Sequence, residues 1–94
     1  MAFVYKRIYY DPSPSYVGVG HWPDPVVERY SVCVRNKDEP TLIRRVGGYA
    51  RRHSGTWEAT MWLDGDTYEH EAPTEEEIKA WMSSLYMLIK GEEP

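Results

Sequence analysis

Side chains that could do acid–base or metal chemistry are few in this sequence and stand apart from one another. His70 lies between Glu69 and Glu71, a combination that would suit a metal ion or a proton-transfer site. In an extended strand, however, neighbouring side chains point to opposite faces, so both carboxylates would face away from the imidazole. Cys33 has Arg35 two residues along the same face, which would favour its thiolate, but no histidine lies at a matching position. We therefore expect no enzyme, no catalytic residue, no metal site and no cofactor.

Large aromatic side chains are stronger candidates for function. Residues 55–63 alternate in the way typical of a strand, and this predicts that Trp57 faces the core while Trp62 faces outward. An exposed ring of this size is commonly a contact residue, because burying it on a partner contributes strongly to binding. The alternative is that the loop over residues 11–25 covers Trp62.

That loop holds four of the seven prolines, together with Tyr16 and Trp22. Proline lacks the N–H that a sheet ladder needs, so the sequence predicts a loop of fixed shape. Such a loop is either a lid over the sheet or a recognition surface. Because prolines lower the ordering cost of binding, the composition favours recognition through Tyr16 and Trp22.

Charge is divided unevenly along the chain, within a net charge of −4. Residues 1–57 carry nine Lys/Arg and five Asp/Glu, whereas residues 58–94 carry two Lys and ten Asp/Glu. This division predicts a basic and an acidic surface, either of which would steer a charged partner. The alternative is that the opposite charges meet across one sheet. The candidate contacts are Arg44, Arg45, Arg51 and Arg52 on the basic side, and Glu69 and Glu71 on the acidic side.

Local signals define the elements that must position these residues. Thr74 and Glu77 have the spacing of a capping box, and Gly91 is a natural helix end, so the sequence predicts a helix over residues 74–90. The pair Gly47-Gly48 predicts a bulge or a close backbone approach within its strand. The apolar stripe predicted for the helix consists of Ile78, Trp81, Met82, Leu85, Leu88 and Ile89.

Five segments have the composition of strands, and they cover residues 3–10, 29–35, 42–52, 55–63 and 67–72. Together with the helix they predict an α+β fold, in which a small antiparallel sheet of four to five strands packs on one C-terminal amphipathic helix. The first strand has two mixed faces, so its inward side stays open.

Length and composition limit the class of protein. With 94 residues, the chain is expected to form one domain over residues 1–94. No run approaches the roughly 20 apolar residues that span a bilayer, and residues 1–10 lack the apolar core of a signal peptide. Cys33 is the only cysteine, which is typical of a reducing interior. We expect a soluble cytoplasmic protein with no membrane contact.

Three short motifs, Arg45-Val46-Gly47, Gly55-x-Trp57-x-Ala59 and Thr74-x-Glu76-Glu77, give residues 44–90 a resemblance to a known family of DNA-binding domains. These three-strand-plus-helix domains occur in plant ethylene-response factors and in the arm-binding part of phage-type integrases, and their sheet enters the major groove. The resemblance implies DNA contacts by Arg44, Arg45, Arg51, Arg52 and Trp62. The chain is also similar in size and style to small accessory proteins of phages and mobile elements.

The sequence favours two hypotheses. The first is a non-enzymatic protein-binding module, an accessory or inhibitory protein whose contact surface combines Tyr16, Trp22 and Trp62. In that hypothesis Glu69 and Glu71 would engage a basic patch on a nucleic-acid enzyme. The alternative is binding of double-stranded DNA by the basic sheet face, through neutralisation of phosphates. The sequence does not specify the oligomeric state.

Overall fold

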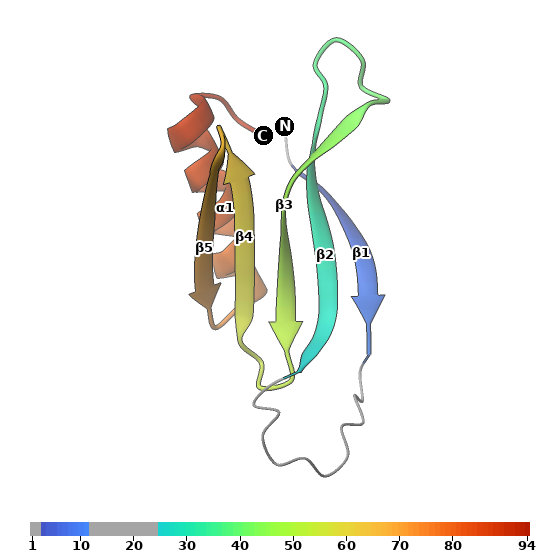
Figure 1. Ribbon diagram of the computed structural model, residues 1–94, viewed down its shortest axis with the longest axis vertical. Helices are drawn as coiled ribbons and strands as arrows, with labels where there is room; N and C mark the ends of the chain where they lie inside the picture. The colour runs from blue at the N-terminus through green and yellow to red at the C-terminus, as the bar shows by residue number, and fades with distance from the viewer. Residues whose placement is uncertain (1–2, 12–24) are drawn as a thin grey trace.

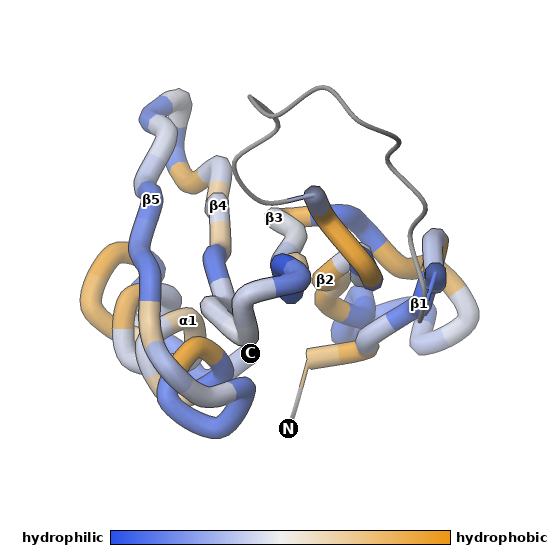
Figure 2. Tube along the Cα trace, turned by 90° about the horizontal axis from the view of Figure 1, so that it is seen from below, coloured by the Kyte–Doolittle hydropathy of each residue, from blue (hydrophilic) through white to orange (hydrophobic). Residues whose placement is uncertain are grey.

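The computed structural model describes residues 3–11 and 25–94, which form a five-stranded sheet and one helix (Figure 1). The elements in chain order are β1 (Val4–Tyr10), β2 (Val26–Arg35), β3 (Ile43–Arg52), β4 (Trp57–Leu63), β5 (Asp66–Ala72) and α1 (Glu75–Lys90). Each strand pairs antiparallel with its neighbour in the sequence. Viewed along the strands, α1 lies on one side of β4 and β5 (Figure 2). The predicted α+β fold is confirmed.

A two-residue turn joins β4 to β5. Leu63 pairs with Asp66, and the two residues between them have positive φ angles of 51° at Asp64 and 85° at Gly65. Both angles are those of a type I′ turn, whose twist matches that of the flanking strands, and Asp-Gly is a preferred sequence for it. This turn fixes the register of the hairpin and hence the side of the sheet on which Trp62 lies.

Both predicted ends of the helix are confirmed. The side-chain oxygen of Thr74 accepts a hydrogen bond of 3.2 Å from the backbone N–H of Glu77. Gly91 adopts the left-handed conformation at φ 71°, and its N–H donates to the carbonyl of Met87 over 2.9 Å. Both contacts satisfy backbone groups that a helix end leaves without partners.

One residue of the predicted apolar stripe is wrong. Leu88 is 78% exposed, whereas Tyr86, which the stripe omitted, is only 3% exposed. The helix turns by about 100° per residue, so Leu88 lies about 120° around the axis from the buried Met82. Tyr86 lies four residues after Met82 and therefore shares its face, where it makes an edge-to-face contact with Phe3 at 5.5 Å between ring centres.

Both features predicted for the glycine pair are present in β3, the bulge at the adjacent Val46 and the close approach at Gly47. Val32 pairs with Gly47 and Cys33 pairs with Arg45, so Val46 is an extra residue in β3, as in a bulge. On the other edge of β3, a Cβ added to Gly47 would clash with the backbone oxygen of Thr60 in β4. Strands β3 and β4 therefore approach each other so closely that a side chain at Gly47 does not fit.

The core lies between the sheet and α1. The inward face of the first strand, left open by the sequence, is the one holding Phe3 and Tyr5. The buried core consists of Phe3, Val32, Val34, Val46, Tyr49, Ala59, Met61, Leu63, Ala72, Ile78, Met82 and Tyr86.

Tyr49 links the sheet to the start of the helix. Its ring is 2% exposed, and its hydroxyl donates a hydrogen bond of 2.7 Å to Oε2 of Glu75. Tyr30 stacks on the same ring at 4.7 Å between centres. Burial, followed by the hydrogen bond to Glu75, strongly raises the pKa of Tyr49. The folded protein therefore keeps this hydroxyl protonated at a pH where an unfolded tyrosine ionises.

This difference predicts a loss of stability at alkaline pH. Below a pH of about 10 the hydroxyl is neutral in both states. Above it the unfolded state loses the proton that the folded state retains, so the free energy of unfolding falls as pH rises, by about 1.4 kcal/mol per pH unit for one group. Tyr49→Phe should show a shallower fall, measured by urea unfolding at several pH values between about 8 and 12. The control is Tyr10→Phe, which changes an exposed ring. Equal slopes in wild type and Tyr49→Phe would contradict the prediction.

Candidate functional site

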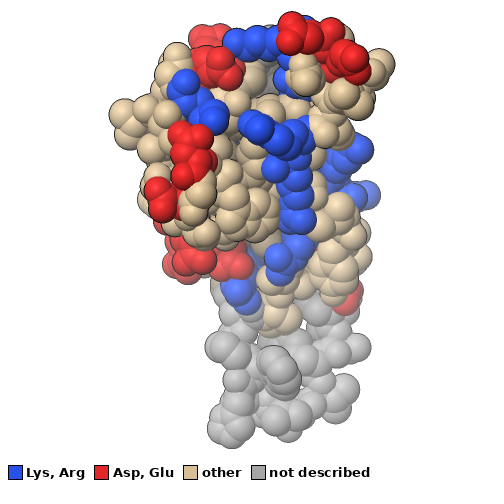
Figure 3. All heavy atoms as spheres, turned by 45° about the horizontal axis from the view of Figure 1, so that its top comes forward, with Lys and Arg blue, Asp and Glu red and all other residues tan. Residues whose placement is uncertain are grey.

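The sheet has one side that α1 does not cover, here called the outer face. Within the described residues no helix packs there, because α1 contacts only the opposite side of β4 and β5 (Figure 2). Two shallow hollows mark this face, one beside Trp62 and one beside Glu69 and Glu71. Figure 3 shows a column of basic side chains down the middle of this side of the molecule, with acidic side chains toward β5.

Trp62 is the large aromatic side chain of the outer face. It is 45% exposed, as the alternation of its strand predicts, while Met61 and Leu63 on either side of it are buried. The guanidinium carbon of Arg45 lies 5.1 Å from the centre of the Trp62 ring, a cation–π distance. Nε of Arg45 also donates to the carbonyl of Gly47 over 3.2 Å. Arg45 is thus held from two directions, with its guanidinium over the indole ring.

Acidic side chains occupy the β5 side of the outer face. Glu58 lies opposite Glu71, and Thr60 lies opposite Glu69. Arg52 neutralises Glu58 through a salt bridge of 2.9 Å. Glu69 and Glu71 are exposed, and neither has an ion pair within residues 3–11 and 25–94. These two carboxylates are therefore available to a cationic group.

The four arginines of the basic cluster do not share one surface. Arg51 lies on the α1 side, where it forms a salt bridge of 3.0 Å with Glu28 and lies 5.9 Å from the ring of Trp57. Arg52 is paired with Glu58 on the outer face. Arg45 contacts Trp62, and Arg44 lies at the far end of the sheet, near the end of α1. Two of the four arginines are thus paired on the sheet, but only the Arg52–Glu58 pair joins the two halves of the sequence, because Glu28 and Arg51 both belong to residues 1–57.

The other residues that the sequence singled out lie away from a common site. Tyr16 and Trp22 lie outside the described residues. His70 stacks on Trp81 of α1, with 5.0 Å between ring centres, so it faces the helix, whereas Glu69 and Glu71 are on the outer face. Cys33 is buried. Within the described part of the chain, no three histidine, cysteine or acidic side chains gather as metal ligands would.

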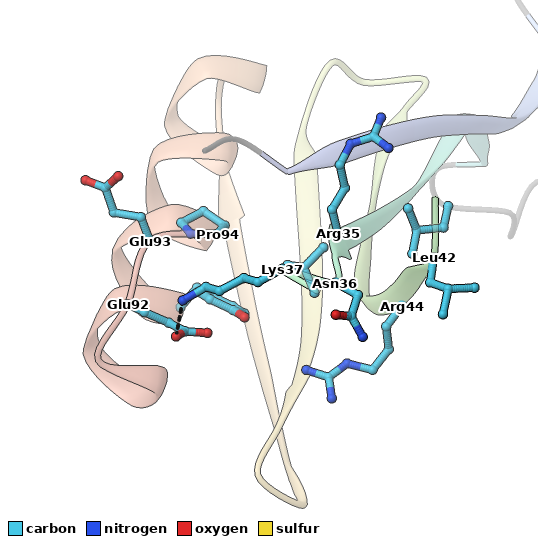
Figure 4. A pocket seen from close by; sticks show the side chains of 11 residues that line it. Arg35, Asn36, Lys37, Leu42, Arg44, Glu92, Glu93 and Pro94 are labelled. Atoms are coloured by element: carbon cyan, nitrogen blue, oxygen red, sulfur yellow. Dashed lines mark hydrogen bonds and ion pairs between the residues drawn. The ribbon is translucent and has the colours of Figure 1, made fainter. Parts of the chain in front are cut away.

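A cleft of about 460 Å³ lies at the end of the sheet where β2 turns into β3. Residues 34–37 and 42–44 form one wall, and Tyr86 with residues 92–94 forms the other. The walls are joined by Lys37, whose Nζ lies 2.9 Å from Oε2 of Glu92 (Figure 4). No signal in the sequence predicts this cleft, because its two walls are some 50 residues apart and meet only when α1 packs back along the sheet.

No helix in the described residues has the length and apolar character needed to cross a membrane. Comparison of the chain with protein-family models, with curated proteins and with solved structures gave no match in any of the three.

Proposed function

We propose that this protein is a non-enzymatic binding module of the accessory or inhibitory kind, and that a protein partner docks on its outer face around Trp62. The observation that carries the proposal is the exposed indole on a sheet face that no described helix covers. Burial of a tryptophan at the centre of an interface often contributes more than the contacts around it. The stacked Arg45 reduces the freedom that the indole would lose on binding.

The charges around Trp62 define the chemistry of the partner. Glu69 and Glu71 lie unpaired, among the described residues, on the β5 side, so they favour a basic group on the partner. Arg29 and Arg45 line the hollow beside the indole and favour an acidic or carbonyl group. A surface that carries positive charges on one side and negative charges on the other orients its partner. It also disfavours partners whose charges are arranged the other way round. The partner expected is a protein with an apolar pocket flanked by basic and acidic residues.

Substitution of Trp62 tests this proposal. We expect Trp62→Ala to weaken partner binding by about 30-fold or more, which corresponds to the loss of a strong central contact, while the circular dichroism spectrum stays unchanged. The matched control is Leu88→Ala, which truncates a side chain that is 78% exposed on α1. Each protein is immobilised, exposed to a lysate of the native host, and its captured proteins are quantified by mass spectrometry. Equal capture by wild type, Trp62→Ala and Leu88→Ala would contradict the proposal.

Binding of double-stranded DNA is the alternative, and the observation that favours it is the exposure of Arg44 and Arg45. The salt bridges of Arg51 and Arg52 weigh against it, since binding to phosphates would compete with Glu28 and Glu58. Fluorescence anisotropy with random duplex DNA at low and near-physiological salt separates the two functions. Salt-sensitive binding that is weakened by joint replacement of Arg44 and Arg45 with alanine would favour DNA.

A further inference from the structure

We infer that the cleft between the β2–β3 turn and residues 92–94 binds a small monocarboxylate, a molecule with one carboxylate attached to an aliphatic or aromatic body. This site lies at the end of the sheet, and Arg44 is the residue that it shares with a hollow beside Trp62. Its volume of about 460 Å³ lies within the range of small-molecule sites.

The apolar part of the ligand is indicated by the side chains that line the cleft. Leu42 is 53% exposed and is among the most exposed large apolar residues in the described chain. It lines the cleft together with Val34, Ile43, Tyr86 and Pro94. Tyr86 and Val34 belong to the core, so the apolar lining continues into a rigid part of the molecule. Removal of this lining from water by an alkyl or aryl group would stabilise the complex.

The carboxylate is indicated by hydrogen-bond donors that have no acceptor. The guanidinium of Arg44 forms no ion pair or hydrogen bond with any residue in the described part of the chain. The side-chain oxygen of Asn36 accepts from the backbone N–H groups of Asp38 at 2.8 Å and Glu39 at 3.3 Å. These bonds fix the orientation of the amide, so its NH₂ group is left to donate elsewhere. A guanidinium beside an amide N–H₂ is well suited to a carboxylate, which guanidinium binds in a bidentate manner.

The other charged side chains of the cleft determine how many carboxylates the ligand carries and toward which wall they point. Arg35 points away from Lys37 and Arg44 in Figure 4, and its NH1 donates to the carbonyl of Pro40 at 2.9 Å. Lys37 is paired with Glu92, and this hydrogen bond lowers the pKa of Glu92. The pair carries no net charge, so it offers no free cation to an anionic ligand. Glu93 also lines the cleft, but its side chain points away from Arg44 in Figure 4. The positive charge left to an anion on the strand wall is that of Arg44, which matches a ligand with one carboxylate directed toward that wall.

An NMR titration with octanoate tests the inference. We expect amide shifts in the ¹⁵N spectrum confined to residues 34–44 and 86–94, with saturation. Octanol has the same chain without the charge, and we expect it to bind about tenfold more weakly, because a hydrogen-bonded charge contributes about that much. Arg44→Gln should weaken the binding of octanoate to a similar extent and leave the binding of octanol unchanged.

The matched control is Arg7→Gln, which removes an exposed arginine in the middle of β1 and should not alter octanoate binding. The inference is overturned if octanoate and octanol bind wild type equally, or if octanoate shifts residues outside the cleft. It is also overturned if Arg7→Gln and Arg44→Gln weaken octanoate to the same extent, since the effect would then follow net charge alone. The comparison of octanoate with octanol uses wild-type protein only and does not depend on the folding of any variant.

Discussion

Gly47→Ala should lower the free energy of unfolding by about 3 kcal/mol or prevent folding, since overpacking a well-packed site costs about 1–3 kcal/mol and occasionally more. The added Cβ would clash with the backbone oxygen of Thr60, and it would lie 3.1 Å from Cγ and 3.2 Å from Cα of Met61. Two of these three atoms belong to the β4 backbone, which cannot rotate away as a side chain does. Relief would require β3 and β4 to separate in the middle of the sheet, where Gly47 pairs with Met61.

The measurement is urea-induced unfolding, monitored through tryptophan fluorescence. Gly48→Ala is the matched control, because it places the same methyl group one residue along the same strand. Its Cβ would lie 3.1 Å from the backbone oxygen of Tyr30 and 3.2 Å from NH2 of Arg45, and the end of the Arg45 side chain can move. We expect a clearly smaller loss for Gly48→Ala. Wild-type stability in Gly47→Ala would show that β3 and β4 do not approach each other as the structure has them.

Met82→Ala should cost about 2–5 kcal/mol, the range for truncating a fully buried large side chain. Met82 is 0% exposed and lies in the core with Ile78 and Tyr86 on the buried face of α1. The loss has two parts. The variant loses the favourable free energy of burying the removed atoms, and a cavity remains between α1 and the sheet. For a domain of this size the expected loss is a large fraction of the total stability, which is typically about 5–15 kcal/mol.

Met87→Ala provides the control for this change. It replaces the same residue type five positions along the same helix, but Met87 is 48% exposed. Both variants replace methionine with alanine in the same helix, so they change the intrinsic helix preference equally and differ only in the burial of the side chain. Surface substitutions of this kind usually change stability by less than about 0.5 kcal/mol. Similar midpoints of urea unfolding for Met82→Ala and Met87→Ala would mean that α1 does not pack on the sheet through Met82.

Features that depend on a few neighbouring residues could be predicted from the sequence. The cap at Thr74 and the helix end at Gly91 use hydrogen bonds that close within four residues. The close approach of β4 to Gly47 follows from the absence of a side chain on glycine. The outward position of Trp62 follows from strict alternation between buried neighbours. In each case the physical cause acts within one element, so its signal is present in a short stretch of sequence.

Features that join distant segments were decided only by the tertiary structure. Arg51 pairs with Glu28 because the β2–β3 register places the two side chains together. Tyr86 is buried and Leu88 is exposed because the direction in which α1 packs selects one part of a broad apolar stripe.

The sequence by itself therefore determined the number and order of the elements, both ends of the helix and the side of the sheet on which Trp62 lies. It did not determine the strand ends, since the second strand begins at Val26 and not at Arg29. The tertiary structure decided which charges are neutralised and where a cleft forms. The physical reason is range: sterics and backbone hydrogen bonds act between near neighbours in the chain. Ion pairs such as Lys37–Glu92, and the cleft that this pair spans, need residues 55 positions apart to meet, and only the packing of α1 along the sheet brings them together.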